Sequence, residues 1–335
     1  MNLSDHSGQK TGYLHSDFRI FYLTNAEQRD FESHYHDFHK LLLFESGSLS
    51  YYIEGETYQL LPNDIVLVPA GEVHRPVIHD ASPYRRLIVY ISPAFFETYQ
   101  AKGVDLFYCF SSCARRSSHV LRLNNFCESR LYPQFQELIH TVAPDAVHSY
   151  AIPKEMCISA SSVTDSSNVY SSSGNLTLSL PSAANSDLQH ERKTLSTYAV
   201  TELYQRSLLL QLLILLSCAS DEADMTFPSA SGSNPQILHA LSYINEHLCE
   251  DLNVDRIAEA CFLNRSYLMH LFRRETGYTI GSYIAEKRLF AARTMIQSGV
   301  SVTEAAMRSG FPSYSAFYRA YQKKFKEPPR NSRRP

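Results

Sequence analysis

Features that would send a chain out of the cytosol or into a membrane are missing from this sequence of 335 residues. The first ten residues, MNLSDHSGQK, contain no apolar segment of the kind that a secretory signal needs. The longest apolar run, 208–219, is interrupted by Gln211 and is shorter than the roughly 20 residues that span a bilayer. We therefore expect a cytoplasmic protein with no membrane partner.

Cysteine is sparse and shows no disulfide pattern. Seven cysteines, an odd number without a CxxC pair, indicate a reducing compartment. Cys109 and Cys113 lie four positions apart, a spacing compatible with metal ligation, but buried or idle thiols are the preferred interpretation. With 44% hydrophobic and 19% charged residues, the composition is that of soluble globular domains, and the length suits two of them.

The charges are divided unequally along the chain. From residue 236 to the end there are 15 Lys and Arg against 9 Asp and Glu, whereas the preceding residues hold 16 against 25. A basic module joined to an acidic one fits a nucleic-acid binder whose regulatory half is repelled by phosphates.

The basic module contains two copies of one helix pair. The first is NVDRIAEACFLNRSYLMHLFRRETG at 253–277, and the second is SVTEAAMRSGFPSYSAFYRAYQKKFK at 301–326. When the copies are aligned, Leu268 falls on Phe317 and Phe272 falls on Tyr321. The repetition predicts two similar structural units.

Each copy is typical of a helix-turn-helix. In the first, Asn253 and Asn264 are expected to cap two helices on either side of a turn at 262–263. The second helix is expected to bury one face and to expose another. The expected buried positions are Tyr267, Leu268, Leu271 and Phe272, and the outward ones are Arg265, Ser266, Met269, His270 and Arg273.

In the second copy, Ser301 and Glu304 form a capping box, Gly310 supplies the turn and Ser313 caps the second helix. That helix is expected to bury Phe317 and Tyr321. Its outward positions are Tyr314, Ser315, Tyr318, Arg319, Gln322 and Lys323. Polar side chains along an exposed second helix are what reading of the DNA major groove requires. A helix over 282–297, roughly 24 Å long at 1.5 Å per residue, is expected to bridge the two units.

The N-terminal half is expected to form short strands. After a loose arm over 1–17, strand-like segments separated by turns occupy 40–45, 49–53, 57–61, 65–68 and 86–91. Such spacing indicates a small antiparallel barrel or sandwich, which we place at 18–144 with a terminal helix from 128.

Histidines flank these strands. His34-Tyr35-His36 precedes the first of them, and Pro69-x-Gly71-x-x-His74 follows a later one, a spacing that resembles the two motifs of the cupin barrel. Lys40 and Leu41 stand where metal-binding cupins have a carboxylate, so we favour a site with no metal or cofactor over a zinc or iron site. The candidate effector-binding residues are His34, His36, Lys40 and His74, with simple lining of the barrel as an equally open role.

The segments between barrel and module differ in composition. Residues 145–196 are a serine-rich insertion, with 12 serines in 145–190, and are expected to be flexible. A leucine-rich helix at 197–219 is apolar on more than one face, which favours packing on its own barrel and on a second subunit over a purely internal role. A polar linker at 220–235 leads to the module at 236–335.

Taken together, these residues resemble the AraC family of bacterial transcription regulators. The match runs through the module and includes Ala258, 272–277, Tyr283, Arg288, Gly310-Phe311 and Pro329. It extends more loosely to 31–91 as the family's cupin-like sensing domain and to 197–218 as its dimerisation helix. The implied fold is α+β: an antiparallel β-barrel with dimerisation helices, and an all-α domain with two helix-turn-helix motifs joined by a long helix.

The resemblance implies base contacts from Ser266, Met269, His270, Tyr314, Ser315, Tyr318 and Arg319. Phosphate contacts are expected from Arg273, Arg274, Lys323 and Lys324, with Arg265 beside them. The family usually has glycine where this chain has Lys326, which costs about 1 kcal/mol if φ is positive there.

The implied function is that of a non-enzymatic, sequence-specific regulator of transcription in the cytoplasm, at the nucleoid. Its implied partners are double-stranded promoter DNA, a small-molecule effector such as a sugar, a second copy of the chain and, as for an activator, RNA polymerase. Two other classes stay open: a metal-dependent cupin enzyme with a DNA-targeting module, and a protein-interaction adaptor.

Overall fold

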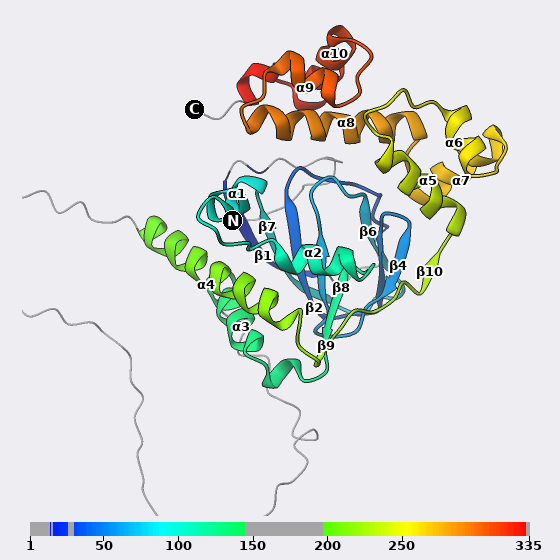
Figure 1. The fold of residues 1–335 in the computed structure, drawn as a ribbon. Helices are drawn as coiled ribbons and strands as arrows, with labels where there is room; N and C mark the ends of the chain where they lie inside the picture. Colours follow the sequence, from blue (N-terminus) through cyan, green and yellow to red (C-terminus); the bar gives the residue numbers. More distant parts are fainter. Residues whose placement is uncertain (1–13, 15, 26–29, 145–196, 333–335) are drawn as a thin grey trace, which may run out of the picture.

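The computed structural model describes residues 14, 16–25, 30–144 and 197–332. Most of the expected arm at 1–17 and the whole serine-rich segment 145–196 lie outside the described residues. The described chain forms an N-terminal unit of antiparallel sheets, called the barrel below, and a C-terminal helical unit, called the module (Figure 1). This confirms the α+β architecture.

Two antiparallel sheets form the barrel. The larger has the strand order β1-β7-β2-β5-β8-β9, and the smaller has the order β10-β4-β3-β6. Their bounds are β1 Phe18–Asn25, β2 His39–Ser46, β3 Leu49–Ile53, β4 Glu56–Gln59, β5 Ile65–Val68, β6 His74–Ile78, β7 Tyr84–Ile91, β8 Val120–Leu123, β9 Met225–Thr226 and β10 Gly232–Ser233.

The central strand β2 is apolar at consecutive positions because both faces of its sheet are covered. Leu41 and Leu43 point to the helices outside the barrel, whereas Leu42 and Phe44 join the core between the sheets. All four are at most 1% exposed. This is the alternation of a strand with period two, here buried on both sides.

Four helices cover the outer face of the larger sheet: α1 Pro93–Gln100, α2 Tyr108–Arg115, α3 Leu131–Val142 and α4 Thr197–Ala219. Helix α4 has 23 residues and is long and apolar enough to cross a membrane, which corrects the expectation drawn from the shorter run 208–219. Its leucines at 209, 212, 213 and 216 are nevertheless completely buried in the barrel core. This face of α4 therefore packs on the barrel.

The segment between α4 and the module is anchored to the barrel at two points. Strand β9 pairs with β8, and β10 pairs with β4 through Gly232 opposite Thr57 and Ser233 opposite Glu56. The polar composition of 220–235 indicates only a linker. Strands of two residues leave no periodic signal in a sequence, so only the fold shows them.

The module consists of α5 Pro235–Glu246, α6 Val254–Ala260, α7 Arg265–Thr276, α8 Ile280–Gln297, α9 Val302–Arg308 and α10 Tyr314–Phe325. It has two small cores, and α8 contributes to both: Tyr283 and Ile284 to the first, Ala292 and Ile296 to the second. This helix lies across one end of the barrel, with α9 and α10 on its far side (Figure 1).

Candidate nucleic-acid interface and histidine site

The first helix-turn-helix forms as its capping residues predict. Asn253 accepts a hydrogen bond from the Arg256 N–H at 2.9 Å, and Asn264 accepts one from the Tyr267 N–H at 2.8 Å. Helix α7 buries Leu268, Leu271 and Phe272. The predicted outward positions are exposed, with 46% of Met269 open to solvent. Two outward arginines have carboxylate neighbours at the surface, Arg265 with Asp255 and Arg274 with Glu275.

The second helix-turn-helix repeats this construction. Ser313 caps α10 by accepting from the Ala316 N–H at 3.2 Å, and Phe317 and Tyr321 are completely buried. On the opposite side, Tyr314, Ser315 and Arg319 are exposed, and Tyr318 is half-buried. The Arg319 Nε donates to the carbonyl of Ser315 at 3.3 Å, so the guanidinium lies along the helix surface.

Arg288 and Gly310 join the two units rigidly. From α8, the Arg288 guanidinium donates to the carbonyl oxygens of Leu248 and Glu250 at 2.8 and 2.6 Å. Gly310 has φ +88°, and a Cβ there would lie 2.7 Å from the same Leu248 oxygen. The turn of the second unit therefore packs on the loop that precedes the first. Helix α8, with 18 residues and a length of about 27 Å, sets the distance between α7 and α10.

Lys324 differs from the other predicted phosphate-binding residues. Arg273, Arg274 and Lys323 are exposed, but the Lys324 side chain is only 11% exposed. Its ammonium lies 2.7 Å from Glu286 and donates to the hydroxyl of Tyr35 in the barrel. Helix α10 is thus tied to the barrel.

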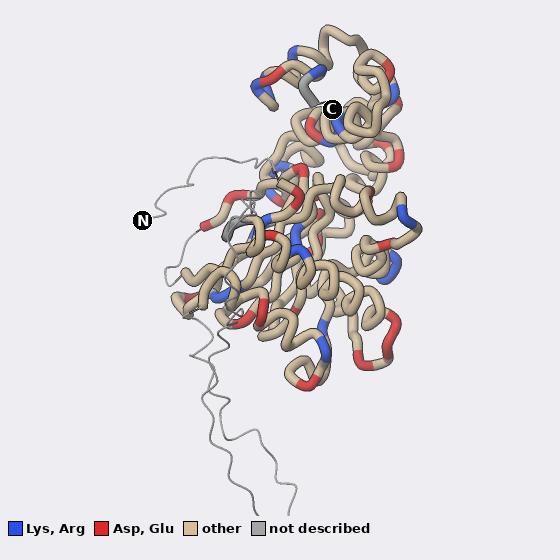
Figure 2. The backbone as a smooth tube through the Cα atoms, turned by 90° about the vertical axis from the view of Figure 1, so that its left-hand side faces the viewer, with Lys and Arg blue, Asp and Glu red and all other residues tan. Residues whose placement is uncertain are grey.

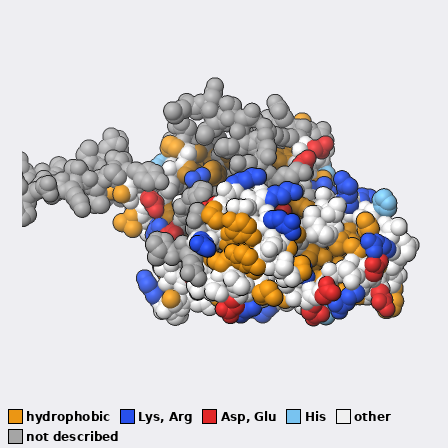
Figure 3. All heavy atoms as spheres, turned by 90° about the horizontal axis from the view of Figure 1, so that it is seen from above, with side chains coloured by type: hydrophobic (Ala, Val, Ile, Leu, Met, Phe, Trp, Pro, Cys, Tyr) orange, Lys and Arg blue, Asp and Glu red, His pale blue; other side chains and the backbone are white. Residues whose placement is uncertain are grey.

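Basic residues are spread along the module rather than gathered in one block. Figure 2 shows Lys and Arg positions interspersed with Asp and Glu positions along its backbone. In the view from above, basic side chains lie beside apolar patches (Figure 3). The turn residue Phe262, 92% exposed, and Met307, 57% exposed, contribute to the apolar surface. Such a mixed surface suits contacts to both phosphates and thymine methyl groups.

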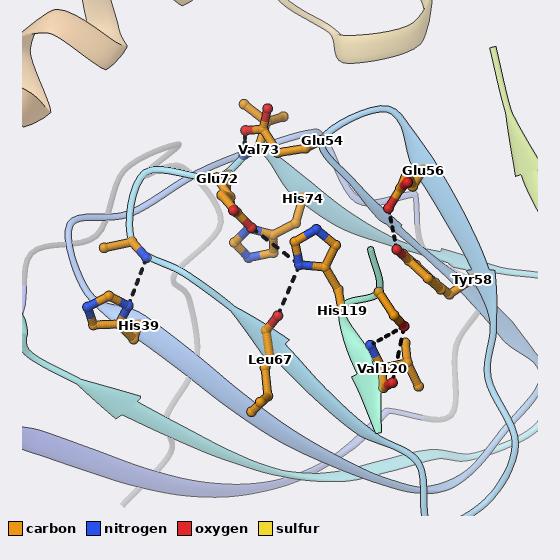
Figure 4. A network of polar contacts seen from close by, with 12 residues as sticks. His39, Glu54, Glu56, Tyr58, Leu67, Glu72, Val73, His74, His119 and Val120 are labelled. Atoms are coloured by element: carbon orange, nitrogen blue, oxygen red, sulfur yellow. Dashed lines mark hydrogen bonds and ion pairs between the residues drawn. The ribbon is translucent and has the colours of Figure 1, made fainter. Parts of the chain in front are cut away.

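The three predicted histidines of the barrel lie together. The backbones of His34 and His74 pair with each other, and their ring centres are 4.5 Å apart. The ring of His36 lies 4.8 Å from that of His74 and 6.4 Å from that of His34. Figure 4 shows His74 below Val73 and Glu54, which lie on the side of the module.

Each of these imidazoles has one nitrogen fixed by a main-chain carbonyl. Nδ1 of His34, His36 and His74 lies 3.0, 2.6 and 2.9 Å from the carbonyl oxygens of Glu32, Phe38 and Glu72. A carbonyl only accepts, so Nδ1 carries the proton and Nε2 keeps its lone pair. Nε2 of His36 and of His74 is buried without a hydrogen-bond partner.

The site keeps its imidazoles neutral. Burial, and then the nearby Lys40 ammonium, lowers the pKa of His34 to about 4. Burial also lowers the pKa of His36 and His74 well below 6.5. Lys40 is itself buried, which lowers its pKa to about 7, and its Nζ donates to the Tyr51 hydroxyl at 2.7 Å. In the described ranges no three His, Cys, Asp or Glu side chains are placed to hold a metal ion.

Comparisons with known proteins identify both halves. Residues 20–149 match the AraC-like ligand binding domain, and residues 257–335 match a helix-turn-helix domain. The regulatory protein SoxS of Salmonella typhimurium is 31% identical over 103 residues, which are 30% of this chain and 96% of SoxS. The chain belongs to the AraC family.

Two further AraC-family relatives differ in how much they share with the chain. The transcriptional activator RhaS of Shigella sonnei is 23% identical over 310 residues, 91% of this chain and 88% of RhaS. The xylose operon regulatory protein of Escherichia coli K12 is 31% identical over 102 residues, so the chain spans only 26% of that relative. RhaS is named as a transcriptional activator, and the other two relatives are named as regulatory proteins.

Sequence reasoning missed the residues that connect the two halves of this AraC-family chain. Tyr35, Asp37 and Glu54 of the barrel contact Lys324, Arg293 and Lys287 of the module. The one available signal was the alternation His34-Tyr35-His36, which places Tyr35 on the opposite side from its neighbours. The prediction that Tyr267 is buried was wrong: it is 47% exposed, because the buried stripe of α7 runs through Leu268, Leu271 and Phe272 beside it.

Proposed function

We propose that the chain regulates transcription by binding double-stranded DNA through α7 and α10, each in one of two adjacent major grooves. The observation that carries this proposal is that α7 and α10 expose matching faces. Helix α8, Arg288 and Gly310 hold these two capped helices in a fixed arrangement. Adjacent major-groove segments lie about 34 Å apart, a distance that the bridging helix of about 27 Å plus the two helix radii can cover.

The outward side chains differ in what they can recognise. Arg319 can donate two hydrogen bonds to guanine O6 and N7, whereas Met269, Tyr314 and Tyr318 can contact thymine methyl groups. Ser266, His270 and Ser315 offer single hydrogen bonds to base edges. Phosphate contacts are assigned to Arg265, Arg273, Arg274, Lys323 and Lys324, of which Lys324 must first leave Tyr35 and Glu286.

The decisive experiment compares Arg319→Ala with Arg308→Ala. Both remove an exposed arginine, but Arg308 lies on α9 beside Glu304 and away from the reading face. With duplexes obtained by in vitro selection on the full-length chain, Arg319→Ala should lose about 1–3 kcal/mol of discrimination at one base pair. Arg308→Ala should keep it. Equal base preference in both variants would remove Arg319 from the interface.

For the effector, we propose a neutral polyhydroxy compound such as a sugar, bound at His34, His36, Lys40 and His74. The imidazoles present lone pairs rather than N–H groups, so the site suits ligands that donate hydrogen bonds. An anionic sugar acid would bring carboxylate oxygens against these lone pairs. The name of the xylose operon relative supports the same ligand class.

Thermal denaturation of the full-length chain with neutral aldoses, D-xylose among them, and with the matching aldonates tests this choice. The aldose should raise the melting temperature more than its aldonate, and His36→Phe should abolish the difference. A preference for aldonates would contradict the chemistry assigned to the imidazoles. Stabilisation by Zn²⁺ alone, lost in the same variant, would make the site a metal site instead.

We also propose that the chain acts as a homodimer. One side of α4 leaves apolar side chains open to solvent, with exposed fractions of 50% for Val200, 67% for Leu203 and 47% for Ile214. A second copy that covers this face would bury it. The regulator would then work at the nucleoid with RNA polymerase as its further partner.

A further inference from the structure

Lys40 places an amine in the interior of the barrel. Its side chain leaves β2 on the same face as Leu42 and Phe44, which join the core between the two sheets. Lys40 is only 5% exposed. Its Nζ lies 2.7 Å from the hydroxyl oxygen of Tyr51, which belongs to β3 in the other sheet. The polar partner of this buried lysine is therefore a phenol.

Two other lysines of the described ranges are largely shielded from water, and both face carboxylates. Lys287 lies 2.9 Å from Glu54, and Lys324 lies 2.7 Å from Glu286. Each carboxylate stabilises the charged form of its lysine. In the part of the chain that the structure describes, Lys40 forms no such pair. Its position therefore disfavours the ammonium form.

The pKa of Lys40 reflects these surroundings. Burial, and then the Arg86 guanidinium, lowers this pKa to about 7. At pH 7 about half of the Lys40 amines are then uncharged, against roughly one in 2,500 for an exposed lysine of ordinary pKa. An amine that is desolvated beside another cation is a nucleophile of the kind that forms imines with carbonyl compounds.

The three imidazoles lie around this amine. Besides burial, the nearby Lys40 ammonium contributes to lowering the pKa of His34, His36 and His74. Tyr51 lies parallel to His74, with the ring centres 6.1 Å apart. His34 is half-buried, whereas the other two histidines and Lys40 are buried, so the site meets the solvent at His34. The site thus combines a nucleophilic amine with lone pairs that accept hydrogen bonds from hydroxyl groups.

We propose that Lys40 captures its ligand as a reversible imine, so that the effector is a hydroxyaldehyde such as an aldose in its open-chain form. The choice of ligand rests on the proposed function, because it uses the same histidine site. The reactivity of Lys40 does not depend on which aldehyde is supplied. A captured ligand is held at one end by a covalent bond and along its chain by hydrogen bonds to the imidazoles.

The capture needs no oxidant or reductant. The Nζ lone pair attacks the carbonyl carbon, a C–N bond forms, and the π electrons of the C=O bond pass to oxygen. One proton moves from nitrogen to this oxygen and gives a carbinolamine. The second nitrogen proton leaves with the hydroxyl group as water, and a C=N bond remains. The Tyr51 hydroxyl lies beside Nζ and can relay both protons, because a phenol donates and accepts hydrogen bonds.

Glycolaldehyde with sodium cyanoborohydride tests the capture on the full-length chain. The hydride reduces each imine to a stable hydroxyethyl amine, and mass spectrometry of peptides reports each lysine separately. At pH 7, Lys40 should be labelled at least about tenfold faster than the exposed Lys102 and Lys323, because far more of it is uncharged. Its labelling rate should be half-maximal at about pH 7, whereas the rates of the exposed lysines should keep rising above about pH 9.

The groups around Lys40 keep their charge across this pH range. Burial lowers the pKa of the imidazoles and raises that of the phenols, and a guanidinium stays charged. The groups concerned are His34, His36, His74, Tyr51, Tyr90 and Arg86. The pH dependence of the labelling therefore reports the amine itself.

Two neighbouring tyrosines supply matched variants. Tyr51→Phe removes the hydroxyl beside Nζ and should slow the labelling of Lys40 at least about tenfold. Tyr52→Phe removes the hydroxyl of the next residue, whose ring packs against Arg75, and should leave the rate unchanged. Lys40→Arg keeps the charge and should remove this label alone. If a variant fails to fold, the comparison of Lys40 with the exposed lysines in the unmodified chain still decides.

Two results would overturn the proposal. One is labelling of Lys40 at pH 7 no faster than that of Lys102. The other is an equal rise in melting temperature with D-xylose and with xylitol, which keeps the hydroxyl groups but has no carbonyl group. The second result would leave sugar binding intact, and a failure of sugars to bind would leave the glycolaldehyde labelling unaffected. Failure of the capture and failure of the proposed function are therefore distinguishable.

Discussion

Lys326 occupies a backbone conformation that favours glycine, and Lys326→Gly should stabilise the module. This residue is the C-cap of α10, with φ +58° and ψ +14°. For a residue with a Cβ, the left-handed region costs roughly 1–2 kcal/mol. Glycine removes that cost, but its greater conformational freedom stabilises the unfolded chain by about 0.4–1 kcal/mol. The expected net gain is therefore about 0.5–1 kcal/mol.

The first copy supplies the matched reverse experiment. Gly277 caps α7 in the corresponding place with φ +79°, and a Cβ there would also lie 3.2 Å from the Cβ of Ser33. Gly277→Ala should therefore destabilise by more than Lys326→Gly stabilises. Urea unfolding of the full-length chain, followed by far-ultraviolet circular dichroism, measures both changes.

Lys326→Ala separates backbone strain from charge. It keeps the Cβ and removes the ammonium, so its free energy of unfolding should stay within about 0.5 kcal/mol of the original. If Lys326→Gly gives no gain while Lys326→Ala does, the cost at this position comes from the lysine side chain and the reasoning from φ is refuted.

Two further predictions concern the barrel and α4. As the pH is lowered from 6.5 to about 4, the free energy of unfolding should decrease by about 1.4 kcal/mol per pH unit for each histidine with a depressed pKa. The reason is that the histidine binds a proton in the unfolded chain but stays neutral in the folded chain. His34, with a pKa of about 4 owing first to burial and then to Lys40, contributes to this slope, and His34→Gln should flatten it in urea titrations at pH 6.5 and 5. Leu203→Glu should shift the chain toward monomer in sedimentation velocity. Val104→Glu, at an apolar position that is 45% exposed in the loop between α1 and α2, should not. Dimers in both variants would show that α4 is not the interface.

The helix pairs were predictable because their signals are local. The side chains of Asn253, Asn264, Ser301 and Ser313 each accept a hydrogen bond from the N–H of the third residue of the helix. The buried positions follow one helical period. The capping box is formed on one side: Ser301 accepts from the Glu304 N–H, while the Glu304 carboxylate lies 3.4 Å from Arg308.

The contact between barrel and module was beyond sequence reasoning. Asp37 and Arg293 are 256 positions apart, and either alone looks like an ordinary surface charge. The spacing of the histidines was enough to group them. It could not predict which ring nitrogen carries the proton, because that depends on the carbonyls of Glu32, Phe38 and Glu72. Pairings between distant segments follow from the whole fold rather than from any window of the chain.

The two short strands of the linker limit how far the DNA-binding half can travel. Helix α5 begins directly after Asn234, so the module cannot swing freely while β10 stays on β4. If β10 detaches and β9 holds, eight residues, 227–234, connect the two halves. Fully extended, they reach no more than about 29 Å. A module that leaves the barrel therefore remains close to it, and at this high local concentration its return to the barrel competes with binding to DNA.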